Sequence, residues 1–281
     1  VEGTMGGGGH SEAILNHLSA EGQLVCLDQD EEAITFSKNR LKRYKDQVSI
    51  INENFSRINH VLYALNIDSI DGFFLDLGVS SHQLDEGNRG FSYLNNGPLD
   101  MRMSQQQQLT AEQIVNNWPE KDLANLVYDF GEERGSRQIA RAIVRAREEK
   151  SRIQTTAELT EIIQSVIPFR FQNKSLSRVF QALRIAVNDE MEVLVNCLQH
   201  IYPYLKKGAR VVIISYHSLE DRMVKYYFRG DPLSFKKQRE WHQGNLFDFD
   251  VLTRRAVTPS DEEIMGNSRA RSARLRAAEI I

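Results

Sequence analysis

The chain has 281 residues, of which 41% are hydrophobic and 26% charged, a composition typical of a globular protein with one large domain or two modest ones. Its formal net charge of −3 excludes binding to nucleic acid through a strongly basic overall field, so any such contact requires local basic patches. Its two cysteines, Cys26 and Cys197, give neither a disulfide framework nor a metal-binding spacing, which favours a reducing compartment, and no apolar run reaches membrane-spanning length.

The chain opens on a glycine-rich stretch, residues 1–11, followed by a helical pattern and an apolar strand over 23–27 that ends in Asp28. Strand, glycine turn, helix, strand and acid in this order are typical of a nucleotide-binding α/β unit, whose acid contacts ribose hydroxyls. Glycines alone are also typical of a flexible linker, but the spacing of the strand and the acid favours the nucleotide loop. Because the Gly-x-Gly-x-x-Gly spacing for a pyrophosphate is not met, we expect a nucleoside ligand without one, such as S-adenosylmethionine. The chain begins on this strand without an initiator methionine, so we expect a preceding segment in the complete protein.

The next α/β repeats place two further candidates at strand ends. A helical pattern over 31–45 and a short strand over 48–51 lead to Phe55, which is placed either to stack on an adenine ring or to serve as ordinary core. A helix near 58–65 precedes the apolar run 70–75, which ends in Asp76-Leu77-Gly78 and predicts a central parallel strand. Asp76 is therefore the sharpest candidate for chemistry, with a helix or turn cap as the alternative.

A long irregular segment, 82–103, follows this strand and carries embedded apolar residues, so it predicts an ordered active-site loop. Residues 104–108 read as a linker, and the pattern from Thr110 to about residue 167 is entirely helical. One of these helices, at about 135–149, carries a stripe of arginines that is either a solvated face or a set of phosphate contacts. The stripe consists of Arg134, Arg137, Arg141 and Arg145.

A single long helical stretch is expected over 177–206, returning the chain to a buried strand at 210–216. His217 follows that strand and, if the strands are parallel and adjacent, shares an edge with Asp76; a structural histidine is the alternative. Toward the end of the chain we expect a strand at 252–255, a helix from about Pro259 and an antiparallel last strand within 267–278. A basic region around Trp241 suits RNA contact, although solubility alone also explains such charges; it includes Lys236, Lys237, Arg239 and His242.

Several phrases together resemble one protein family closely. They are Gly8-Gly9-His10-Ser11, the run 76–81 with Gln83-Leu84-Asp85, the run 89–92, the run 97–103, the run 131–134, the run 180–188 and the run 217–222. Over nearly its whole length the chain resembles the small-subunit ribosomal RNA cytosine-N4 methyltransferases of bacteria and organelles. It departs from that family in lacking a leading His-x-Pro-Val segment and in having His82 where proline is common.

The resemblance implies an α/β fold: a class I (Rossmann-like) methyltransferase core with a doubly wound sheet, formed by 1–103 and 188–281. An all-helical substrate-recognition subdomain is then inserted at 104–187. The donor would be S-adenosyl-L-methionine, and the acceptor a cytosine of the decoding region in small-subunit (16S-type) ribosomal RNA. The donor-binding positions carried over are Gly8, Gly9, His10, Asp28, Phe55, Asp76 and Gln83.

Methylation of a cytosine amine requires acceptors for the amine protons, because the nitrogen lone pair is delocalised into the ring. We expect Asp76 or nearby backbone carbonyls to be the main acceptor. The other predicted catalytic residues are Ser80, Asp100 and His217. The base must be unpaired or flipped, with the RNA held by Arg102 and the arginine stripe.

Rival hypotheses come from other classes. A nicotinamide oxidoreductase would need a pyrophosphate loop that these glycines do not supply. A methylase of another RNA or of protein would share the donor site, and a non-catalytic RNA-binding factor would keep the basic surfaces but not bind the donor. We expect the small ribosomal subunit (30S-type particle) as partner, no membrane, no metal, and a homodimer as a candidate assembly. The expected location is the bacterial cytoplasm, with the mitochondrial or plastid matrix as the alternative.

Overall fold

The computed structural model describes residues 1–149, 152–231 and 247–281. The basic residues expected around Trp241 lie outside these ranges. The described chain forms two compact units, one made of Val1–Gly78 with Met191–Ile281 and the other of Val79–Glu190. The predicted insertion, 104–187, thus lies within the second unit, which also contains residues 79–103. Among the described residues, no helix combines the length and the apolar character needed to cross a bilayer.

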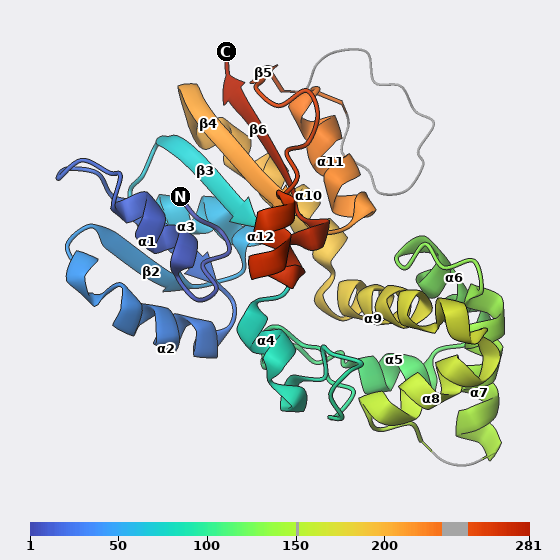
Figure 1. Cartoon of the computed structure of the whole chain (residues 1–281). Coiled ribbons are helices and arrows are strands. Elements are labelled where there is room, and N and C mark those ends of the chain that lie inside the picture. Colours follow the sequence, from blue (N-terminus) through green and yellow to red (C-terminus); the bar gives the residue numbers. More distant parts are fainter. Residues whose placement is uncertain (150–151, 232–246) are drawn as a thin grey trace. The chain divides into compact units, whose positions relative to one another are not determined.

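A mostly parallel sheet is the centre of the first unit (Figure 1). The segment around Glu2 joins two sets of strands, because it forms parallel bridges to Cys26 on one side and to Phe74 on the other. The resulting order is β2, β1, the Glu2 segment, β3, β4, β6 and β5. β6 is antiparallel to both of its neighbours, β4 and β5, whereas β1 pairs with β2 and β3 with β4 in parallel. The strands are β1 (Leu24–Asp28), β2 (Val48–Asn52), β3 (Ile70–Asp76), β4 (Leu205–Ser215), β5 (Phe249–Val251) and β6 (Arg274–Ile280).

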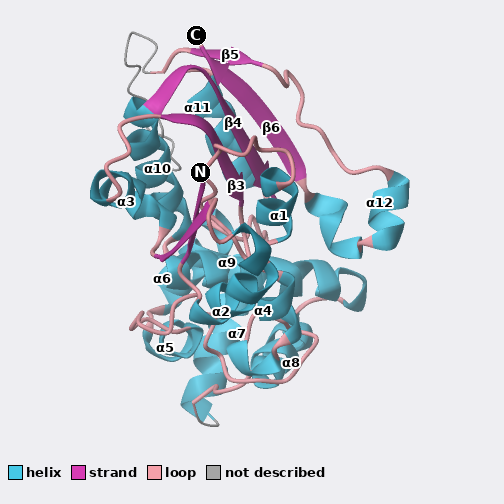
Figure 2. Cartoon of the chain, turned by 90° about the vertical axis from the view of Figure 1, so that its left-hand side faces the viewer, coloured by secondary structure: helices cyan, strands magenta, loops and turns pink. Residues whose placement is uncertain are grey.

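Helices cover both faces of this sheet: α1 lies on one side, and α3, α10 and α11 on the other (Figure 2). The predicted doubly wound α/β class is therefore confirmed. Along β1 the burial pattern is nearly continuous, as expected for a parallel strand covered on both faces. The helices of this unit are α1 (Gly9–Leu15), α2 (Glu31–Arg40), α3 (Ile58–Ala64), α10 (Glu190–Ile201), α11 (Ser218–Phe228) and α12 (Asp261–Gly266).

The second unit is helical and has a hydrophobic core of its own. Thr110 and Thr155 are the N-caps of two of its helices, since each forms a capping box with the residue three positions later. The irregular segment before these helices contributes Phe91, Leu99 and Met101 to the same core, which explains why it belongs to this unit. The helices are α4 (Ser81–Asp85), α5 (Ala111–Asn117), α6 (Glu120–Asp129), α7 (Ser136–Glu149), α8 (Thr156–Val166) and α9 (Gln172–Asn188).

The structure corrects the expectations for three segments. The stretch 177–206 is not one helix: α9 ends where Asp189 adopts a left-handed conformation (φ 49°), and β4 already begins at Leu205. The strand expected at 252–255 lies earlier, as β5, because the N–H groups of Leu252 and Thr253 both donate to the Ala277 carbonyl and end the regular ladder. The last strand is confirmed as antiparallel, but the residues before it, Ser268–Ser272, form a 3-10 helix that the Asn267 side chain caps.

Candidate active site

Several predicted residues of the first unit lie at one edge of the sheet, the edge formed by the carboxyl ends of the parallel strands. The parallel strands β1, β3 and β4 end at Asp28, Asp76 and Ser215, and the glycine loop follows the Glu2 segment between β1 and β3. In an open α/β sheet, ligands bind outside the carboxyl ends of such strands. Asp28, Asp76 and the glycine loop therefore lie along the edge where a ligand is expected.

Backbone contacts hold the glycine loop against β1 and α2. The Gly6 N–H donates to Asp28 Oδ2 (2.7 Å), and the Ser37 hydroxyl donates to the Gly6 carbonyl (2.7 Å). Gly8 has a φ of 72°, and a Cβ there would lie 3.0 Å from the Ser37 oxygen. Glycine is thus required at this position both for the backbone conformation and for the close approach of α2.

Asp28 carries the features expected of a ribose-binding acid. Burial raises its pKa, although hydrogen bonds from the Asp30 and Gly6 N–H groups oppose that rise. Each carboxylate oxygen accepts one of these two bonds, which fixes the orientation of the carboxylate at the end of β1. The lone pairs that remain can accept hydrogen bonds from sugar hydroxyls.

Phe55 begins a 3-10 helix directly after β2 and is half-buried. A Cβ placed on Gly3 would lie 3.1 Å from Phe55 Cβ and 2.6 Å from Leu75 Cδ2. Because Gly3 has no side chain, Phe55 and Leu75 can lie close to the Glu2 segment. Stacking of Phe55 on an adenine ring stays a prediction.

Asp76 lies at the end of β3 and is held from several sides. Its N–H donates to Thr4 Oγ1 (2.7 Å), and its Oδ1 accepts a hydrogen bond from the Tyr216 hydroxyl (3.0 Å). His10 Nδ1 lies 3.5 Å from its Oδ2, while the His10 ring packs edge-on against Phe74. Within the described ranges no lysine or arginine pairs with Asp76. Burial raises the pKa of Asp76, and the neighbouring His10 and Tyr216 only partly offset that rise.

Tyr216 is the functional candidate that sequence reasoning missed. It directly follows β4, one residue before His217, and the pairing of β4 with β3 brings its hydroxyl to Asp76. His217 instead caps α11 and is buried: its Nδ1 accepts from the Glu220 N–H (3.4 Å), and its Nε2 lies 3.1 Å from Glu220 Oε1. The position after the strand was the available signal, and it pointed equally to both residues.

Glu2 was also missed, and it is fully buried within the sheet. The Ser11 hydroxyl donates a short hydrogen bond to Glu2 Oε2, and Cys26 Sγ lies 3.7 Å from the same oxygen. Oε1 has no hydrogen-bond partner among the described residues. Burial raises the pKa of Glu2 to about 7, so this acid is half-protonated near neutral pH. The signal for it in the sequence was an acid in the stretch directly before the glycine loop.

Two predicted residues of the second unit pair with each other. Ser80 is the N-cap of α4: its hydroxyl accepts from the Gln83 N–H (3.2 Å), and the Gln83 amide oxygen accepts from the Ser80 N–H (2.9 Å). This reciprocal capping box orients both side chains at the start of the helix. Their catalytic and donor-binding roles stay predictions.

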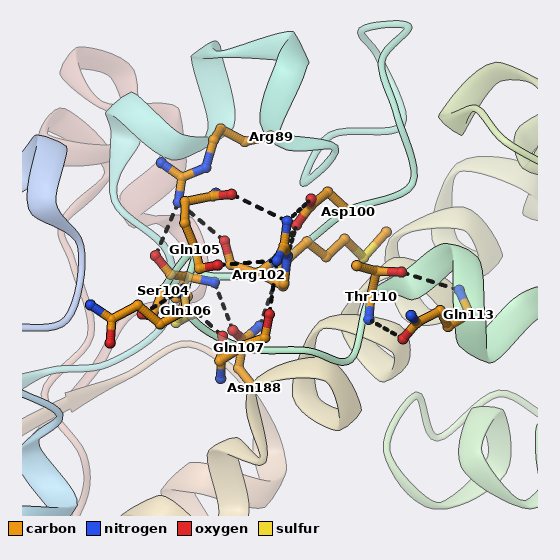
Figure 3. Close-up of polar contacts among 12 residues, drawn as sticks. Arg89, Asp100, Arg102, Ser104, Gln105, Gln106, Gln107, Thr110, Gln113 and Asn188 are labelled. Carbon is orange, nitrogen blue, oxygen red and sulfur yellow. Dashed lines mark hydrogen bonds and ion pairs between the residues drawn. The ribbon is translucent and has the colours of Figure 1, made fainter.

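Asp100 and Arg102, predicted as catalytic and RNA-binding, form a bidentate ion pair (Figure 3). Arg102 Nε donates to Asp100 Oδ1 (2.9 Å), and a terminal nitrogen donates to Oδ2 (2.7 Å). The same guanidinium donates to the Gln105 and Gln107 carbonyls, so it also holds the linker after it in place. Burial opposes ionisation of Asp100, but the hydrogen bonds from Arg102 outweigh it and hold the Asp100 pKa below its usual range.

Two arginines of the stripe lie within ion-pair distance of glutamates, and within the described ranges the other two do not. On α7, Ile139 and Ile143 are buried, and all four arginines are exposed. Arg141 faces Glu120 (3.7 Å) and Arg145 pairs with Glu149 (2.8 Å). Among the residues that the structure describes, Arg134 and Arg137 have no ion pair or hydrogen bond from their side chains. The stripe therefore leaves two cations uncompensated at the start of α7.

Comparison with known proteins identifies the family of the chain. The model of the MraW methylase family matches residues 1–281. The ribosomal RNA small subunit methyltransferase H of Halothermothrix orenii is 43% identical over 288 residues, which cover 99% of this chain and 91% of that protein. The protein of the same name from Kosmotoga olearia is 45% identical over 287 residues, covering 100% and 90%. A solved rRNA methylase structure from Streptococcus thermophilus aligns with a TM-score of 0.44 and 10% identity, covering 100% of this chain and 84% of that one. The chain belongs to the MraW methylase family, and its methyl donor is S-adenosylmethionine.

Proposed function

We propose that this protein methylates N4 of a cytosine in the decoding region of small-subunit ribosomal RNA. Full-length similarity to relatives named ribosomal RNA small subunit methyltransferase H carries the choice of substrate. A half-buried acid that pairs with no lysine or arginine of the described residues, Asp76, supports the choice of an amine as the methyl acceptor.

The residues along the sheet edge fit the methyl donor. Asp28 offers carboxylate oxygens to the ribose, and the loop Gly6–Gly9 offers backbone without side chains at the start of α1. We infer that Gly8, Gly9, His10 and Phe55 contribute to donor binding, and we keep Gln83 of the second unit as a further donor-binding candidate. When bound, S-adenosylmethionine supplies an electrophilic methyl group on a positively charged sulfur.

Asp76 then acts on the acceptor base. A cytosine amine becomes nucleophilic when its N–H protons are hydrogen-bonded and its lone pair is drawn out of conjugation. The Asp76 carboxylate accepts such a bond, and Tyr216 and His10 fix its orientation. Its raised pKa makes Asp76 a better proton acceptor than an ordinary exposed aspartate. Ser80, Asp100 and His217 are secondary candidates for the same task.

The target base must leave any helix it belongs to before it can reach this edge. The second unit supplies exposed cations for the RNA backbone, above all Arg134 and Arg137 of the α7 stripe. Arg141 and Arg145 would have to exchange their glutamate partners for phosphates. The proposed substrate places the reaction where small ribosomal subunits are assembled, in the bacterial cytoplasm or an organelle matrix.

The test is methylation of defined substrates. Small subunits prepared without the modification are incubated with the protein and isotope-labelled donor, digested to nucleosides and analysed by mass spectrometry. We expect labelled N4-methylcytidine at one position of the decoding region. Label on another atom or base would contradict the acceptor assignment, and parallel reactions with protein-free RNA would separate free RNA from the assembled subunit as substrate.

A further inference from the structure

Two exposed aromatic residues lie between α8 and α9 in the second unit. Phe169 is 89% exposed and Phe171 is 46% exposed. Isolated exposed apolar residues are common, but here two large aromatic rings are exposed only two positions apart. An exposed aromatic ring can stack on a ligand that has a flat apolar face.

Hydrogen bonds fix the backbone of the segment that carries these rings. Phe169–Phe171 form a 3-10 helix after Pro168, and the Phe171 N–H donates to the Pro168 carbonyl (2.8 Å). The Gln172 side chain donates to the carbonyls of Gln164 (3.0 Å) and Ile167 (3.1 Å), which ties the segment to the end of α8. The two rings are therefore presented from a fixed backbone.

Two basic residues, Arg170 and Lys174, lie close to the rings in the sequence. The Arg170 guanidinium lies 4.6 Å from the centroid of the Phe171 ring, a cation–π distance. Lys174, one turn further on in α9, is exposed and has no ion pair among the described residues. The nearby acid Glu133 is buried, and Arg178, Ser175 and the Gly135 N–H already bind its carboxylate.

The free arginines of α7 belong to the same neighbourhood. The Gln138 side chain donates to the Val166 carbonyl (2.8 Å), and a Cβ on Gly135 would lie 3.2 Å from Ile167 Cδ1. The start of α7 thus packs against the residues just before Pro168. Arg134 and Arg137, the uncompensated pair of the stripe, project from that start.

Aromatic faces interspersed with unpaired cations match single-stranded RNA, whose bases stack on such rings while its phosphates bind the cations. A protein partner would be expected to find a less charged apolar surface at the centre of its interface. Resting on the function proposed above, we propose that Phe169, Arg170, Phe171 and Lys174 form a platform for an unpaired stretch of the substrate RNA. One base stacks on Phe169, and the flanking phosphates contact Arg170, Lys174 and the start of α7.

The test compares binding of a fluorescent single-stranded RNA oligonucleotide by wild type and variants, measured by anisotropy, with the KM for unmodified small subunits. Phe169→Ala should weaken RNA binding about 5- to 150-fold, the range expected for loss of one stacked base. Phe169→Trp retains a stacking face and should bind within about twofold of wild type. Tyr128→Ala removes another exposed aromatic residue of the same unit, 61% exposed on α6, and should leave binding unchanged. Melting temperatures establish that each variant is folded.

The charged residues give a second readout. Arg170→Gln combined with Lys174→Gln should reduce the slope of log Kd against log salt concentration by about 0.7 for each lost phosphate contact. Equal RNA affinity of Phe169→Ala and Tyr128→Ala would overturn the platform. So would loss of self-association in Phe169→Ala with unchanged RNA binding, which would assign the surface to a second copy of the chain.

The outcomes also separate this inference from the proposed function. If the wild type methylates N4 of cytosine but Phe169→Ala changes neither the RNA Kd nor KM, the platform alone is wrong. If Phe169→Ala weakens RNA binding but the wild type places no methyl group on cytosine N4, the proposed reaction alone is wrong.

Discussion

Two acids at the ends of strands in the first unit and two acids of the second unit have pKa shifts in opposite directions. At the sheet edge of the first unit, Asp28 and Asp76 are half-buried among neutral donors and a histidine, and desolvation raises the pKa of both. In the second unit, Asp100 and Glu133 are bound by Arg102 and Arg178. Burial opposes their ionisation as well, but their hydrogen bonds outweigh it and lower the pKa of both.

This difference separates two uses of buried charge. A carboxylate whose desolvation is offset by a bidentate arginine stabilises the fold and has few lone pairs left for a ligand. A carboxylate held in place without a compensating cation is kept at a cost in stability, and such groups cluster at functional sites. By this criterion we expect Asp28 and Asp76 to be available for donor and substrate, and Asp100 to be the weakest of the catalytic candidates.

The largest effect is expected at Asp76. Asp76→Asn keeps the shape of the side chain and an oxygen for the Tyr216 hydroxyl, but it removes the charge and the basicity. Methyl transfer should fall about 10²- to 10⁴-fold, the usual contribution of a general base. The measurement is single-turnover methylation of small subunits at saturating donor.

Asp71→Asn is the matched control, because Asp71 lies on the same strand but is exposed and pairs with Lys206. It should retain wild-type activity. Full methyl transfer by a folded Asp76→Asn would remove Asp76 from the mechanism and would weaken the contrast between the two units.

Much of the first unit was predictable because its signals are local. An apolar run that ends in Asp-x-Gly places Asp76 at the end of a buried strand whatever the rest of the chain does. The distance from the glycines to Asp28 likewise reflects one helix and one strand. Both predictions depend on residues close together in the sequence.

The partners of these acids were not predictable, because pairing between distant segments decides them. Tyr216 reaches Asp76 across 140 positions, only because β4 lies beside β3. The left-handed conformation at Asp189, which divides the expected long helix, is uncommon for a residue other than glycine and leaves no pattern in the sequence. Arg102 was expected to face RNA, and no periodicity could show that its guanidinium folds back onto Asp100.

Glu2 gives the second-largest expected effect, on stability. Its pKa is raised from 4.5 to about 7, so between these values the native state binds more protons than the unfolded state. The free energy of unfolding should therefore fall by about 3 kcal/mol as pH rises through that window and on to about pH 8. Glu2→Gln removes this titration, so its stability relative to wild type should improve by a similar amount from pH 5 to pH 8.

Urea unfolding at several pH values measures the difference. Glu21→Gln, at an exposed acid of the same unit, should leave the wild-type pH profile in place. If the free energy of unfolding of Glu2→Gln depends on pH in the same way as that of wild type, the pKa of Glu2 is not raised by folding.

The smallest effect separates a structural Asp100 from a catalytic one. The Asp100–Arg102 pair is 21% exposed on both sides, whereas the pair Arg145–Glu149, with a similar separation, is 74% and 55% exposed. Asp100→Asn should cost about 1–2 kcal/mol of stability at neutral pH, and Glu149→Gln less than about 0.5 kcal/mol. Because the Asp100 pKa is lowered on folding, its contribution is present above the normal carboxyl range and is lost as pH falls through the lowered pKa. The cost of Asp100→Asn in urea unfolding should therefore shrink in acid. A large loss of kcat in Asp100→Asn without loss of stability would instead make Asp100 part of the chemistry, and the arginine criterion would fail at the residue for which it was drawn.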